Sequence, residues 1–151
     1  MRVCFAASSG GHLEQLMMLY PLMIENDSFI FTEKTTFNYY YKGIECHEVF
    51  QINRREKLFI IKLIMLIFIT FFVLIKRKPD VIISTGALVT LPLCLVGKIF
   101  GKKIVFIESF SKVNSPTLTG RIVYKFADLF IVQWEDMKKV YPKAKYGGGI
   151  Y

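Results

Sequence analysis

The chain has 151 residues, 53% of them hydrophobic, and 20 Lys and Arg against 12 Asp and Glu give it a formal net charge of +8. This apolar content excludes an intrinsically disordered chain, and the length suits one domain with a core of its own. The positive charge favours anionic partners: nucleic acid, anionic lipid or a phosphorylated substrate. Three widely spaced cysteines, each inside an apolar run, predict buried thiols in a reducing compartment.

Strand-like apolar runs alternate with helical patterns from end to end, and the first run begins at once, without a signal peptide. We expect strands over 2–7, 28–32, 44–52, 80–84, 103–107 and 129–132. Helical patterns follow over 13–24 (shortened or kinked by Pro21), 58–75, 90–101, 118–126 and 135–141, with Thr90 as a helix cap. This alternation predicts an α/β fold with a doubly wound parallel sheet, which binds ligands beyond the carboxyl ends of its strands.

The run Leu58–Ile75 is apolar except for Lys62 and Thr70. As a helix it would be about 27 Å long, close to the ~30 Å hydrocarbon core of a bilayer. Because strands of one sheet are expected on both sides of it, we favour a crossover helix lying at a membrane surface. A helix buried against another subunit and a spanning helix are the alternatives. Basic residues within 54–78 suit an anionic leaflet: Arg54, Arg55, Lys62, Lys76, Arg77 and Lys78.

The first strand ends in a turn of small residues, Ser8-Ser9-Gly10-Gly11, followed by His12. Such a turn allows close backbone approach of a ligand, and the amides of the following helix favour an anion. At this place His12 has the chemistry of a general base for a sugar hydroxyl. The alternative is a plain turn with a solvated or capping histidine. His47, inside a strand, is expected to be structural.

Two further turns follow strands at the same predicted edge. Thr85 and Gly86 come after the strand 80–84, and Glu108 and Ser109 come after the strand 103–107. Glu108 is a candidate to hold a sugar hydroxyl or to orient His12. The alternative is a loop or helix-cap carboxylate paired with Lys112 or Arg121. Three such turns at corresponding strand ends are more informative than any one of them.

Five segments together resemble a known family over nearly the whole chain: SSGGHLEQL (8–16), PDVIISTGA (79–87), FIESF (106–110), SPTLTGR (115–121) and ADLFIVQWE (127–135). This family is the membrane-anchoring, acceptor-side subunit of two-part glycosyltransferases. One branch is eukaryotic and helps to add N-acetylglucosamine to a dolichol-diphosphate-linked sugar. The other is the bacterial capsule and exopolysaccharide subunit that enhances a β-1,4-galactosyltransferase. The chain has no hydrophobic N-terminal extension of the eukaryotic kind and so resembles the bacterial branch.

The family in turn resembles the N-terminal half of MurG, a GT-B glycosyltransferase. The Gly-Gly-His of its glycine-rich loop falls on Gly10, Gly11 and His12, and its second glycine turn falls on Gly86 and Ala87, one glycine short. The resemblance implies a Rossmann-like half domain over 1–151 and a separate polypeptide that supplies the nucleotide-sugar half. It implies no bound metal or other cofactor, and the sequence holds no metal-ligand pattern.

The sequence therefore predicts an accessory subunit, inactive alone, that docks on the cytoplasmic face of the cell membrane and recruits a catalytic subunit. The complex would transfer a hexose, with galactose from UDP-galactose as the expectation, to a lipid-diphosphate-linked sugar. His12 and Glu108 are the expected catalytic residues, and the acceptor would be held by Ser9, Gly10, Gly11, Thr85, Gly86 and Ser109. The tail 143–151, with Ile150 and Tyr151, is expected to dock on the partner.

Two other functions compete with this prediction. One is a pure scaffold that contributes no catalytic side chain, and the other is a stand-alone nucleotide-binding protein. Nucleic acid is not an expected partner, because the aromatic residues lie in apolar runs and the basic ones flank a single helix.

Overall fold

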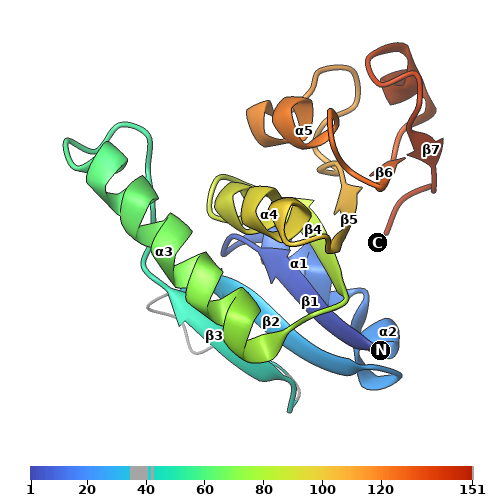
Figure 1. The fold of residues 1–151 in the computed structure, drawn as a ribbon. Coiled ribbons are helices and arrows are strands. Elements are labelled where there is room, and N and C mark those ends of the chain that lie inside the picture. Colours follow the sequence, from blue (N-terminus) through green and yellow to red (C-terminus); the bar gives the residue numbers. More distant parts are fainter. Residues whose placement is uncertain (35–40, 42, 151) are drawn as a thin grey trace.

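A computed structural model describes residues 1–34, 41 and 43–150 of the chain (Figure 1). Within that part, all strands belong to one parallel sheet in the order β3-β2-β1-β4-β5-β6-β7. The strands in chain order are β1 (Arg2–Ala7), β2 (Asp27–Glu33), β3 (Glu45–Val49), β4 (Val81–Gly86), β5 (Lys103–Ile107), β6 (Leu129–Val132) and β7 (Lys145–Tyr146). The predicted doubly wound parallel sheet is confirmed. Its strand order reverses between the neighbours β1 and β4, the place where such sheets bind ligands.

Helices cover both faces of the sheet (Figure 1). α3 (Phe59–Arg77), α4 (Thr90–Ile99) and α5 (Leu118–Val123) lie on one face, and α1 (Gly11–Met17) and α2 (Tyr20–Ile24) lie on the other. Pro21 stands in the first turn of α2, where its missing N–H costs nothing, so the expected break of the first helix is confirmed. The side chains of β1 alternate between two cores: Cys4 and Ala6 face α3 and α4, whereas Phe5 and Ala7 face α1.

α3 is the predicted crossover helix, since it leaves β3 and returns the chain to β4 in the same sheet. The most apolar 18-residue stretch of α3 has a mean hydropathy of 2.6, and only 22% of it is buried. By length and composition, α3 is the one helix in the described part of the chain that could cross a membrane. Its buried residues are Leu66, Thr70, Val73 and Leu74. Three further apolar residues, Phe59, Leu63 and Ile69, are half-buried against the same core. The other large apolar residues are exposed and form what we call the α3 face: Ile60, Ile61, Ile64, Met65, Ile67, Phe68, Phe71, Phe72 and Ile75.

The apolar surface extends beyond α3 onto α4. The ring of Phe71 packs edge-on against Phe100 at 5.5 Å, just after the end of α4. Ile99, at the end of the same helix, is 83% exposed. The apolar surface therefore spans two adjacent helices, which a search for one hydrophobic run does not reveal.

Two of the basic residues expected at the membrane are engaged within the molecule. Lys62 forms an ion pair with Glu56 and donates to the carbonyl of Gln51 at 3.2 Å. Arg77 forms an ion pair with Glu45. Lys76 and Lys78 remain exposed at the C-terminal end of α3. Lys62 and Arg77 therefore already have carboxylate partners, which weakens their attraction to an anionic leaflet; that they lie at a membrane stays a prediction.

Three local expectations also change. Val89, not Thr90, is the N-cap residue of α4, and the Thr90 hydroxyl donates to the Ala87 carbonyl at 2.9 Å. The pattern over 135–141 is a short 3-10 helix, η1 (Glu135–Lys139). The tail 143–151 contains a short strand, β7, that was not among the expected strands.

Candidate functional site

His12 lies at the carboxyl edge of the sheet, across the β1–β4 boundary from Thr85. Its Nδ1 is 2.8 Å from the Thr85 carbonyl oxygen, and the Thr85 hydroxyl donates to the His12 carbonyl at 2.7 Å. A carbonyl oxygen can only accept, so Nδ1 carries the hydrogen in this bond and Nε2 of the neutral ring keeps its lone pair. The two reciprocal bonds thus hold the ring with Nε2 available to accept a proton.

A cavity of about 280 Å³ adjoins this ring, and we call it the His12 cavity. Its lining comes from the first turns of α1 and from the loop after β5: Gly11, His12, Gln15, Ser109, Phe110 and Ser111. The hydroxyls of Ser109 and Ser111 are 3.0 Å apart. An imidazole, an amide and two hydroxyls around one space suit a polyhydroxylated ligand such as a sugar.

Thr85 and Gly86, expected to bind substrate, instead position His12. Both are buried, and the Thr85 hydroxyl is used in the bond to His12. Gly86 has φ +104, and a Cβ there would lie 3.6 Å from the His12 ring and 3.3 Å from Phe106. Ala87 also has a positive φ, 78°, a conformation that suits glycine. Ala87, the second residue of this turn, therefore has a strained backbone conformation close to His12.

Glu108 does not support His12, so that expectation is wrong. Its side chain is 1% exposed, and its carboxylate accepts from Thr117 Oγ1 at 2.9 Å and from the Tyr141 hydroxyl at 2.8 Å. It also accepts from the amides of Ser109 and Thr117, at 2.9 and 3.2 Å. Thr117 is the N-cap of α5, so Glu108 is a buried carboxylate bonded to a helix-cap residue. Within the described residues it forms no ion pair with Lys112 or Arg121, the partners that the alternative expected.

Burial, followed by the negative charge of Glu108, raises the pKa of Tyr141 above its ordinary value. Its hydroxyl therefore keeps the proton that it donates to Glu108.

Gly120 in α5 packs directly against Glu108, because a Cβ at this position would overlap the Glu108 carboxylate. We call these residues the Glu108 network: Glu108, Thr117, Gly120 and Tyr141. The network ties β5, α5 and the end of η1 together.

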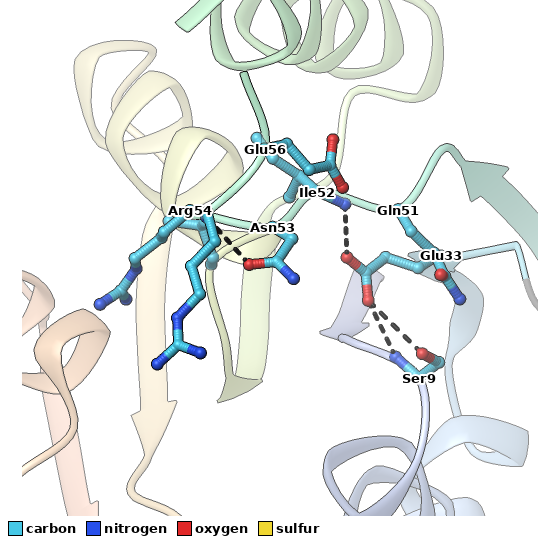
Figure 2. Close-up of a pocket in the computed structure, with 9 residues that line it drawn as sticks. Ser9, Glu33, Gln51, Ile52, Asn53, Arg54 and Glu56 are labelled. Carbon is cyan, nitrogen blue, oxygen red and sulfur yellow. Dashed lines mark hydrogen bonds between the residues drawn. The ribbon is translucent and has the colours of Figure 1, made fainter. Parts of the chain in front are cut away.

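A second cavity, of about 520 Å³, opens on the other side of the β1–α1 turn (Figure 2). We call it the Arg54 cavity, and it is lined by Ser9, Glu33, Gln51, Ile52, Asn53, Arg54, Arg55, Glu56 and Leu88. Figure 2 shows Glu33 bonded both to Ser9 and to the Ile52 amide, which is 3.2 Å away. Arg54 and Arg55, expected at the membrane, thus line a polar cavity at the carboxyl edge.

The other predicted site residues divide between the two cavities. Ser9 lines the Arg54 cavity, and Gly11 and Ser109 line the His12 cavity. Gly10 is exposed at the N-cap of α1 with φ 78°, and its carbonyl accepts from the Leu13 and Glu14 amides.

His47, which is expected to be structural, stacks on the ring of Phe31 with the ring centroids 5.9 Å apart. Burial lowers the pKa of His47.

Sequence reasoning missed the cavity residues Gln15, Phe110 and Ser111. Gln15 is three residues after His12 in α1, so it lies on the same helix face, and this spacing was a usable signal. Gln15 is buried, and its Oε1 lies 3.4 Å from Gln133 Nε2, which donates to the Glu108 carbonyl at 2.9 Å. Phe110 was not foreseeable as a lining residue, because the course of its loop depends on Trp134, whose ring nitrogen donates to the Phe110 carbonyl at 2.6 Å.

The tail is fastened to the chain's own sheet. The Gly147 amide donates to the Val132 carbonyl at 3.0 Å, and the Ile150 amide donates to Gln133 Oε1 at 2.9 Å. Ile150 packs partly buried against the core on the α1 side. Ile150, expected to dock on the partner, is therefore already packed against the chain's own core, and Tyr151 lies outside the described residues.

Comparison with solved structures confirms the Rossmann-like fold of a GT-B half. MurG from Acinetobacter baumannii superposes with a TM-score of 0.79 at 14% identity, over 99% of this chain and 46% of MurG. The lipopolysaccharide outer core galactosyltransferase WaaB superposes with a TM-score of 0.66 at 13% identity, over 92% of this chain and 41% of WaaB. At these identities the likeness concerns the fold alone.

Curated relatives are similar in sequence over about half of the chain. The UDP-N-acetylglucosamine transferase subunit alg14 of Schizosaccharomyces pombe is 44% identical over 75 residues, which are 46% of this chain and 36% of that protein. The human subunit ALG14 is 38% identical over 86 residues, which are 52% of this chain and 40% of that protein. The matched segment thus spans well under half of the length of these relatives.

The family model described as "Oligosaccharide biosynthesis protein Alg14 like" matches residues 32–150. That range includes both turns after β4 and β5, the Glu108 network and all of α3. Residues 1–31, with β1, the His12 turn, α1, α2 and most of β2, lie outside it. On this evidence, the chain belongs to the Alg14 family.

Proposed function

We propose that this chain is the acceptor-side, membrane-recruiting subunit of a UDP-sugar-dependent glycosyltransferase, and that a separate catalytic subunit holds the nucleotide sugar. The printed names of the relatives are those of a UDP-N-acetylglucosamine transferase subunit. The fold matches 46% of MurG, so the residues of this chain correspond to one half of such an enzyme. One observation carries the proposal: the Thr85 carbonyl holds the His12 ring by a hydrogen bond, beside the His12 cavity at the switch point of the sheet.

In this proposal His12 is the general base. As the acceptor hydroxyl attacks the anomeric carbon of the donor sugar, its proton passes to Nε2 and the nucleoside diphosphate leaves with the bonding electrons of the broken C–O bond. Such a base contributes roughly a hundredfold to ten-thousandfold in rate. Gln15, Ser109 and Ser111, which surround the same space, orient the acceptor sugar by hydrogen bonds.

Membrane association is assigned to the α3 face. The side chains of Phe68 and Phe72 are 60% and 66% exposed, and α4 adds Ile99 and Phe100 to the same apolar surface. Lys76 and Lys78 at one end, with Lys57 at the other, are exposed cations beside it. An apolar helix face with flanking cations suits a monotopic position at an anionic leaflet, and this supports our proposal that the chain acts on the cytoplasmic side of the cell membrane.

The acceptor in this proposal is a lipid-diphosphate-linked saccharide, in capsule or exopolysaccharide synthesis. A membrane-docked surface beside the site supports a lipid-linked substrate. The relatives' names favour UDP-N-acetylglucosamine as the donor, whereas resemblance to the bacterial branch favours UDP-galactose. Both donors are therefore compared in the test.

The decisive experiment reconstitutes this chain with its catalytic partner in membranes that carry a lipid-diphosphate-linked acceptor. Transfer from radiolabelled UDP-N-acetylglucosamine and UDP-galactose is measured with the wild type, His12→Ala and the control His47→Asn. We expect transfer from one donor, a loss of at least a hundredfold in His12→Ala, and near-normal transfer in His47→Asn. Full transfer by His12→Ala would show that this chain is a scaffold without a catalytic side chain.

A further inference from the structure

The Arg54 cavity is not used by the catalysis proposed above. It lies where β1, β2, β3 and β4 end, because its lining comes from the residues that follow these strands: Ser9, Glu33, Gln51 to Glu56, and Leu88. Its volume of about 520 Å³ falls within the usual range for small-molecule pockets. The strand order reverses between β1 and β4, so the cavity occupies the switch point where doubly wound sheets bind ligands.

The free charge in this cavity is positive. Within the part of the chain that the structure describes, neither the Arg54 nor the Arg55 guanidinium has an ion-pair partner. The two carboxylates nearby are already engaged: Glu33 accepts from Ser9 and the Ile52 amide, and Glu56 pairs with Lys62. Two guanidinium forks without carboxylate partners are the arrangement that recognises phosphate oxygens bidentately.

The start of α3 adds to this positive character. The helix has 19 residues, its first turn holds no acidic side chain, and no side chain caps its free amides. The partial positive charge of this helix N-terminus therefore lies four residues after Arg55 in the chain. Together, the two arginines and the helix end favour an anion of more than one charge.

The surroundings of the cavity indicate which anion this is. Leu58, Ile60 and Ile61, which follow within a few residues, are between 55% and 61% exposed and open onto the α3 face. On the opposite side, Ser9 of the cavity is separated from Gly11 and His12 of the His12 cavity by Gly10 alone. A ligand that extends across this region would contact the apolar α3 face, then the cationic Arg54 cavity, and then the His12 cavity with its general base.

We propose that the Arg54 cavity binds the diphosphate of the lipid-linked acceptor, with Arg54 and Arg55 on its oxygens and the lipid on the α3 face. This inference rests on the proposed function for the identity of the acceptor. The same diphosphate chemistry occurs in a nucleotide sugar. The lipid is favoured because the apolar surface begins at the rim of the cavity.

The test measures binding to the full chain in neutral detergent, with farnesyl diphosphate and inorganic pyrophosphate as probes. Arg54→Ala/Arg55→Ala is compared with Lys125→Ala/Lys138→Ala, which removes the same charge from exposed positions outside the cavity and the α3 face. We expect the first variant to weaken both probes at least tenfold and the control to change them less than twofold. We also expect farnesyl diphosphate to bind at least tenfold more tightly than pyrophosphate, and UDP not to displace it.

Equal losses in the two variants, or no loss in either, would overturn the site, because the attraction would then be general charge. Displacement of farnesyl diphosphate by UDP at similar concentration would overturn the lipid assignment in favour of a nucleotide. None of these measurements requires sugar transfer. A chain that binds the probes through Arg54 and Arg55 but supports no transfer with its partner would refute the proposed function and leave the diphosphate site standing.

Discussion

The Glu108 network makes a sharp prediction for Glu108→Gln, which keeps the shape of the side chain and changes one oxygen to NH₂. Both carboxylate oxygens of Glu108 accept from backbone amides, Oε1 from Ser109 at 2.9 Å and Oε2 from Thr117 at 3.2 Å. Oε2 also accepts from the Tyr141 hydroxyl at 2.8 Å. Whichever way the new amide is oriented, its NH₂ group faces an N–H donor and that donor loses its acceptor.

The cost follows from this geometry and from the burial of the side chain, which is 1% exposed. An unsatisfied buried donor costs about 1–3 kcal/mol, and the remaining bonds lose the extra strength of a charged acceptor. We therefore expect the free energy of unfolding to fall by about 3 kcal/mol, on the order of 6–12 °C in Tm for a domain of this size.

Urea and thermal unfolding of the full chain, followed by circular dichroism, measure this loss. The matched control is Glu135→Gln, which makes the same change at an exposed glutamate in η1 and is expected to leave stability unchanged. Transfer activity of the reconstituted complex at low temperature, where the variant remains folded, should stay within a few-fold of wild type. A variant of wild-type stability whose turnover falls a hundredfold would refute this reasoning and return Glu108 to catalysis.

Three further outcomes are expected. Ala87→Gly should stabilise the chain by about 0.5–1 kcal/mol in urea unfolding, because glycine relieves the positive φ of 78° at the cost of some chain entropy; a destabilised variant would contradict strain at this turn. Phe68→Glu/Phe72→Glu should move the chain from sedimenting liposomes to the supernatant, whereas the same change at exposed Lys138 and Lys139 should not. Deletion of 147–151 should lower stability by removing the Ile150 packing, and partner capture at full yield by the folded remainder would exclude docking through the tail.

The order of the elements and the class of fold follow from local patterns in the sequence. Apolar runs of period two and helical spacing alternate so regularly that the parallel sheet was predictable, as were the split at Pro21 and the crossover role of α3. These features depend on local pattern and on the rule that a crossover returns to its own sheet. The turn that carries His12 was also predictable from the sequence. In a parallel sheet, ligands bind at the carboxyl ends of the strands, and His12 comes shortly after the end of the first predicted strand.

The partners of the individual side chains at that edge, in contrast, depend on contacts between parts of the chain that are far apart in sequence. Glu108 follows β5 and Thr85 lies near the end of β4, so both are at the ligand edge of the sheet. The carboxylate of Glu108 is bonded to Thr117 and Tyr141, whereas the hydroxyl of Thr85 donates to the His12 backbone carbonyl. Their partners are between 9 and 73 residues away in sequence. Arg54 and Arg77 are equal as basic flanks of an apolar helix, but Glu45 on β3 neutralises only the second. Hydrogen bonds and ion pairs over such separations are set by strand order and packing, which no local pattern encodes.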